Sequence, residues 1–126
     1  MQVKIDTKEI FHVITLETPT LSANMTAELN ECLLPYLQKD IRHIVLNLKE
    51  LQQIDLAAGE TLVKIQQKFY ENKASFVICE LQPGPERFLD ENELLELMNV
   101  TPSESEAWDI LQMEEIEREL MDGESS

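Results

Sequence analysis

The sequence predicts an α/β fold, a mixed β-sheet of about five strands with about four helices in the order β-β-α-β-α-β-α-β-α. Short β-rich runs alternate along the chain with segments of helical periodicity. Residues 41–48 and 75–79 are nearly continuous apolar runs, as expected for strands buried on both faces. The 126 residues are 43% hydrophobic, which suffices for one domain with its own core.

The chain opens with a predicted hairpin. Residues 3–6 alternate apolar and polar side chains, which is typical of a half-buried strand. Residues 11–16 are rich in β-branched and aromatic side chains, and Lys8 and Glu9 between the two runs suit a turn. We therefore expect two paired strands before the pattern breaks at Pro19.

The first helix is predicted between the hairpin and the apolar run at 41–48. Ser22 and Asn24 are residue types that cap helices. Apolar residues between positions 25 and 37 have helical spacing, which predicts a helix of about 14 residues. Pro35 lies near its end and is expected to bend or shorten it.

A second helix and a further strand follow the run at 41–48. The helix is predicted to open in residues 54–59 and to end at residues 72–73, and residues 75–79 form the next buried strand. Residues 83–85 are predicted to be a loop, with Pro85 in the first turn of a short helix through Leu89.

The last elements are less regular. Residues 94–100 fit either a continued helix or an edge strand, and their β-branched end favours a strand in the second half. Residues 103–106 match a capping box and begin the last helix. Trp108 is expected to pack from this helix onto the sheet, and residues 122–126 are expected to fray.

The charge of the chain is strongly acidic and unevenly distributed. It has 10 Lys and Arg residues against 25 Asp and Glu residues, a formal net charge of −15. This excess argues against a nucleic-acid binder and against an anionic membrane surface as partner, because both need a cationic footprint. Residues 1–79 have a net charge of −2, whereas residues 80–126 have a net charge of −13.

The acidic third has two interpretations. It is either a solvated helix face that keeps the protein soluble or a docking surface for a basic partner. The last helix also carries an apolar stripe, which consists of Ile110, Met113, Ile116 and Leu120. This stripe has two interpretations as well, because a homodimer contact and a helix that closes the sheet would both produce it.

Composition also indicates the cellular compartment in which the protein is expected. No apolar run approaches the roughly 18 residues of a membrane span. The N-terminus lacks the layout of a signal peptide, and the two cysteines are too few for a disulfide framework. We therefore expect a soluble, cytoplasmic protein.

No pattern of catalytic chemistry is recognised. His12 and His43 lie in different strand-like runs without a metal-ligand motif, and three glycines do not build a phosphate loop. The sequence therefore predicts no catalytic residue, no metal site and no cofactor, and it argues against an enzyme.

The chain resembles the STAS domain family. The order of elements over residues 1–111 is similar, and residues 44–55 resemble the family's hydrophobic strand, short linker and Asp-Ser-Ser/Thr-Gly loop. Residues 97–107 resemble its closing strand, threonine-rich turn and Glu-Ala helix. The resemblance divides the chain into a STAS-like domain at 1–111 and an acidic helical extension and tail at 112–126.

The resemblance implies a regulator like the anti-sigma factor antagonists. In that family the Ser or Thr two places after the loop Asp is phosphorylated by a partner kinase that is also the anti-sigma factor. Here that position is Ala57, after Asp55, and alanine has no hydroxyl. Thr61 is the nearest hydroxyl, one helical turn further along, and is the other candidate for phosphorylation.

A permanently unphosphorylated loop corresponds to the form that binds the anti-sigma factor in the family. The resemblance therefore implies binding to an anti-sigma factor or another kinase-fold protein. The alternative is a constitutive scaffold or a subunit of a larger complex, for example with a transporter ATPase. The expected contact residues are Leu21, Ser22, Asn24, Asp55, Leu56, Ala57, Ala58 and Gly59, and Leu56 is either an exposed contact or folded inward.

Overall fold

The computed structural model describes the backbone of residues 1–125 and the side chains of residues 1–121. Its main sheet has five strands in the spatial order β1-β2-β4-β6-β7. The strands are β1 (Val3–Thr7), β2 (Phe11–Leu16), β4 (His43–Asn47), β6 (Phe76–Cys79) and β7 (Val100–Thr101). Strand β1 is antiparallel to β2, and the other neighbours are parallel. The predicted α/β class with a mixed five-stranded sheet is confirmed.

The described residues also form four α-helices and three short 3-10 helices. The α-helices are α1 (Thr26–Leu33), α2 (Leu56–Glu71), α3 (Pro83–Glu91) and α4 (Glu104–Ser125). The 3-10 helices are η1 (Ala23–Met25), η2 (Leu34–Gln38) and η3 (Leu95–Leu97). Two short strands, β3 (Thr20–Leu21) and β5 (Gln53–Ile54), pair in parallel outside the main sheet.

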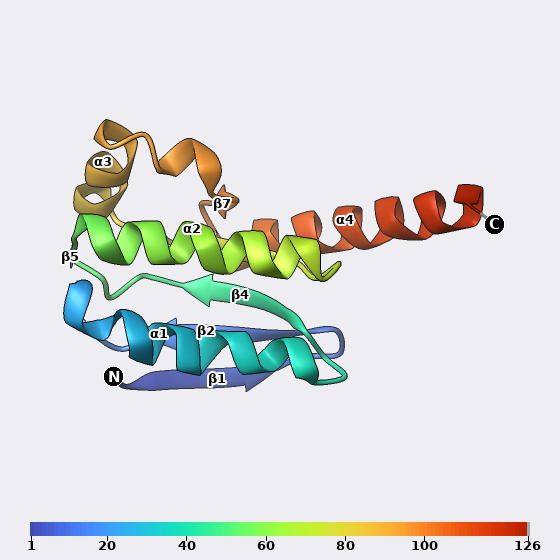
Figure 1. Cartoon of the computed structure of the whole chain (residues 1–126), viewed down its shortest axis with the longest axis horizontal. Coiled ribbons are helices and arrows are strands. Elements are labelled where there is room, and N and C mark those ends of the chain that lie inside the picture. The colour runs from blue at the N-terminus through green and yellow to red at the C-terminus, as the bar shows by residue number, and fades with distance from the viewer. Residues whose placement is uncertain (126) are drawn as a thin grey trace.

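The sheet is covered on both faces, because its central strands are apolar on both sides. Helices α1 and α2 lie side by side over one face (Figure 1), and the larger core lies beneath them, with Ile14, Leu46 and Ile78 on adjacent strands. The alternate residues Val45 and Val77 face the other way and form a smaller core with the first turns of α4. Helix α4 then projects past the end of the sheet (Figure 1).

Several predicted boundaries need correction. The first helix is shortened as expected, because Pro35 lies in η2 and not in α1. The loop predicted at 83–85 is wrong: α3 begins at Pro83, since proline suits the first helical turn, where its missing N–H leaves no bond unmade. We expected fraying from residue 122, whereas the described helix reaches Ser125; Ser126 lies outside the described residues.

The last helix contacts the sheet over less of its length than its apolar residues suggest. Ala107 and Leu111 are fully buried, and they set the face that turns inward. Trp108 lies to one side of that face and is 42% exposed, and it lines a hollow beside the β1–β2 hairpin together with Phe11. Among the described residues, none of the helices is both long and apolar enough to span a membrane.

Candidate functional site

The loops predicted to bind a partner meet at one edge of the sheet. Strands β2, β4 and β6 are parallel, so their carboxyl ends lie at the same edge, where η1, α2 and α3 begin (Figure 1). The β3–β5 pairing joins the first two of these loops. Within it the N–H of Asp55 donates to the carbonyl of Leu21 at 3.1 Å.

Asp55 holds the two loops together with its side chain. It is the N-cap of α2, and its Oδ1 accepts a hydrogen bond from the N–H of Ala58 at 2.9 Å. Its Oδ2 accepts one from the N–H of Ala23, the first residue of η1, at 2.8 Å. One carboxylate therefore satisfies free donors at the start of two helical segments.

Ser22 and Asn24 do not act as the expected helix caps. Ser22 precedes η1, but its side chain makes no capping hydrogen bond. Its hydroxyl donates instead to the Oδ1 of Asn24. The cap of this segment comes from Asp55, far away in the sequence, which explains why local sequence patterns assigned it wrongly.

Burial divides the expected contact residues into two groups. Leu56 is 46% exposed, so of its two predicted orientations the structure has the outward one. Leu21 is 0% exposed, Ala58 is 1% exposed and Gly59 is buried, so a partner cannot reach these three side-chain positions directly. They shape the loop from inside in the free protein, whereas Leu56 is open to a partner.

Gly59 allows the loop to pack closely against the following helices. A Cβ atom at this position would lie 2.9 Å from Leu89 Cδ2 and 2.9 Å from Leu94 Cδ1. The glycine therefore serves the close approach of α3 and the segment before η3 to the start of α2. Its backbone φ is not positive, so turn geometry does not require it.

Ala57 is the second residue of α2, at the positive end of the helix dipole. It is half-buried beside the exposed Leu56. The Oγ1 of Thr61 donates to the carbonyl oxygen of Ala57 at 2.9 Å. The nearest hydroxyl predicted from the sequence is thus bonded to the helix backbone, a common arrangement for Thr inside helices.

The structure adds α3 to this edge. A hollow of about 410 Å³ lies between the two loops and α3. Its wall includes Ser22, Asp55, Gly84 and Phe88. Sequence reasoning missed Gly84 and Phe88, because nothing local indicates that the start of α3 faces the other two loops.

The cysteines do not supply reactive thiolates. Burial, together with the nearby carboxylates of Glu104 and Glu80, raises the pKa of Cys79 to about 12. Burial also raises the pKa of Cys32. Within the part of the chain that the structure describes, no group of His, Cys, Asp and Glu side chains is arranged to hold a metal ion.

The chain was compared with protein families and with curated protein sequences. The sequence model of the STAS domain matches residues 2–107. A search of curated protein sequences found no match to the chain.

Solved structures share the fold at low sequence identity. An anti-sigma-factor antagonist (STAS) domain protein from Planctomyces limnophilus is 16% identical; the alignment covers 87% of this chain and 97% of that one, with a TM-score of 0.74. A variant of RsbS from Moorella thermoacetica is 21% identical; the alignment covers 89% of this chain and 96% of RsbS, with a TM-score of 0.72. The murine anion transporter Slc26a9 is 14% identical, with 86% of this chain but 18% of the transporter covered, and a TM-score of 0.70.

Proposed function

This chain belongs to the STAS domain family, and on that premise we propose that it is a non-enzymatic regulator that binds an anti-sigma factor or another kinase-fold protein. The binding surface is the exposed part of the loop edge. We call it the loop-edge surface, and it consists of Ser22, Asn24, Asp55, Leu56 and Ala57. Sequestering its partner would release a sigma factor and so control transcription.

The observation that supports this proposal most is the arrangement of Leu56 and Ala57 at the start of α2. Leu56 is an exposed large apolar residue, and Ala57 carries neither charge nor hydroxyl. The carboxylate of Asp55 between the two loops is already bonded to two backbone N–H groups. A partner can therefore cover Leu56 and Ala57 without having to desolvate a phosphate.

Rigidity of the loop edge favours binding as well. The β3–β5 pairing and the Asp55 carboxylate hold both loops in the free protein. Loops that are already ordered lose less conformational entropy when a partner binds. This is the role we assign to the buried residues Leu21 and Ala58.

The test is a binding assay between the purified chain and the anti-sigma factors and kinase-fold proteins encoded beside it. We expect one of them to bind, and Leu56→Asp and Ala57→Asp to weaken the complex by at least about tenfold, as at a contact hot spot. Leu97→Asp is the matched control, because Leu97 is 55% exposed but lies on η3. Absence of binding across the set, or an equal loss with the Leu97 variant, would contradict the proposal.

A second function has its own supporting observation. Ala57 lacks the hydroxyl of the family's phosphorylated position, and the Thr61 hydroxyl is bonded to the helix. This favours a constitutive STAS module that stays bound within a larger complex. Addition of the chain to a preformed complex of the neighbouring anti-sigma factor with its sigma factor separates the two, because an antagonist releases the sigma factor and a constitutive module does not.

A further inference from the structure

We propose that the outward face of α4 between Met113 and Leu120 is a second docking surface, and that its partner is a basic amphipathic helix of another protein. The proposal concerns the opposite end of the molecule from the loop-edge surface (Figure 1), and it does not depend on the proposed function. It rests on three observations: how the helix is held, which side chains it leaves exposed, and which charges flank them.

Helix α4 is held on the domain as far as Arg118. After the buried Leu111, two side chains of the helix bond to Ser75, which precedes β6. The Ser75 hydroxyl donates to Glu114, and Arg118 Nη2 donates to the same Ser75 oxygen at 2.6 Å. Arg118 Nη1 also donates to Glu115 Oε2 at 3.0 Å. These bonds fix the orientation of the helix up to residue 118, so its other face points away from the sheet.

That outward face carries an apolar stripe. Met113 is 56% exposed, Ile116 is 56% exposed and Leu120 is 63% exposed. At 3.6 residues per turn these three positions line up along one side of the helix, opposite Leu111. We call them the α4 stripe. Their spacing of three and four residues is that of a helix seam that packs against another helix.

The charges beside the stripe are negative. Glu117 and Glu119 lie on its two sides, and Asp109 lies one turn before Met113; all three are exposed. The one cation among the described side chains of residues 109–121, Arg118, is turned inward to Glu115 and Ser75. A helix that covers the stripe must therefore carry Lys or Arg at its flanking positions, because acidic residues there would face the carboxylates of α4.

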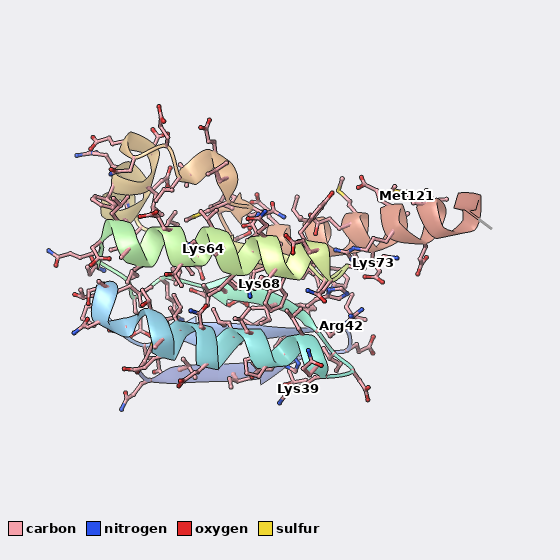
Figure 2. All side chains as sticks on the ribbon, in the orientation of Figure 1. Lys39, Arg42, Lys64, Lys68, Lys73 and Met121 are labelled. Atoms are coloured by element: carbon pink, nitrogen blue, oxygen red, sulfur yellow. The ribbon has the colours of Figure 1, made fainter. Side chains whose placement is uncertain are left out.

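The same charges argue against a homodimer in which the α4 stripe of one chain packs against the α4 stripe of another. Two α4 stripes facing each other would bring acidic flanks together, and each chain has a net charge of −15. Of the cations that Figure 2 labels, Lys39, Lys64 and Lys68 lie on the α1–α2 side, away from Met121 on α4, whereas Lys73 lies nearer to α4.

The test uses the full chain and two synthetic helices of about three heptads, both with leucine at the seam positions. One has lysine and the other glutamate at the flanking positions, and binding is followed by fluorescence anisotropy at low and high salt. We expect the lysine-flanked helix to bind at least about tenfold more tightly, with an affinity that falls as salt screens the flanking charges.

Variants locate the binding. Ile116→Lys and Leu120→Lys should each weaken binding by at least about tenfold, as for a central contact, whereas the exposed Leu97→Lys on η3 should not. Circular dichroism checks that each variant keeps its helix content. Equal binding of both peptides, wild-type affinity of the α4 variants, or a dimer in sedimentation that Leu120→Lys dissociates would overturn the proposal.

Discussion

The side chain of Asp55 reaches across 32 residues to the backbone of Ala23, where its Oδ2 accepts a hydrogen bond at 2.8 Å. The other oxygen of the same carboxylate caps α2 through Ala58. The two loops of the loop-edge surface therefore share one anchoring group, and we expect them to loosen together when it is removed.

Asp55→Ala should lower the free energy of unfolding by about 1–2 kcal/mol, because an N-cap and a second hydrogen bond are lost. Denaturant titration measures the loss, and amide hydrogen exchange should accelerate at both Ala23 and Ala58. The exposed Asp109→Ala is the control. Faster exchange at Ala58 alone would mean that the bond to Ala23 does not hold the first loop.

Ala57→Ser should restore a phosphorylation site without disturbing the fold, since a half-buried position in a first helical turn accepts serine at a cost within about 0.5 kcal/mol. With the kinase-fold partner and ATP, the γ-phosphoryl group would pass to the serine Oγ, ADP would be the leaving group, and the hydroxyl proton would be released. Mass spectrometry should find one added phosphoryl group on the variant and none on the wild type. A phosphoryl group on Thr61 of the wild type would show that the switch is retained there.

His43 should make the stability of the α4 contact depend on pH. Its Nδ1 accepts the N–H of Ser75 at 2.9 Å, and its Nε2 lies 2.8 Å from Glu115 Oε2, so the neutral ring fits this site. Burial lowers the pKa of His43, and the cations of Arg118 and Arg42 act in the same direction, whereas Glu115 opposes them. The folded state therefore binds a proton less readily than the unfolded state does.

The sign of the effect follows from this lowered pKa. The contribution of His43 is complete above its ordinary value of about 6.5 and is lost as the pH falls below it, because the unfolded chain takes up the proton first. Unfolding of the wild type and of His43→Gln at about pH 7.5 and about pH 5.5 measures it. The wild type should lose more stability between the two conditions than the variant; an equal loss would exclude His43 as the cause.

Leu111 and Leu120 should differ sharply although both belong to α4. Leu111 is 0% exposed, and Leu111→Ala should cost about 2–5 kcal/mol. Leu120 is 63% exposed, and Leu120→Ala should change stability by no more than about 0.5 kcal/mol. Denaturant unfolding of both variants tests this. A large cost at Leu120 would mean that the projecting half of α4 belongs to the folding core.

Local patterns predicted most elements because local interactions determine them. The alternation in residues 3–6, the apolar run at 41–48 and the helical spacing after residue 56 correspond to β1, β4 and α2. The two-residue strands β3 and β5 were not predicted, because so short a run has no detectable period. Their pairing depends on the approach of loops far apart in the sequence.

The fold class, the identity of the loop that starts α2 and the absence of a hydroxyl at Ala57 follow from residue type and spacing alone. Which of the expected contact residues are accessible depends on how the chain packs around them. Leu21 in β3 and Leu56 at the start of α2 are both leucines of the expected contact set, yet one is fully buried and the other is half-exposed. Burial depends on what the rest of the chain places around a side chain, and that information is distributed over distant segments. For the same reason only the structure shows that the apolar stripe of α4 points away from the sheet, because Ala107 and Leu111 occupy the inward face.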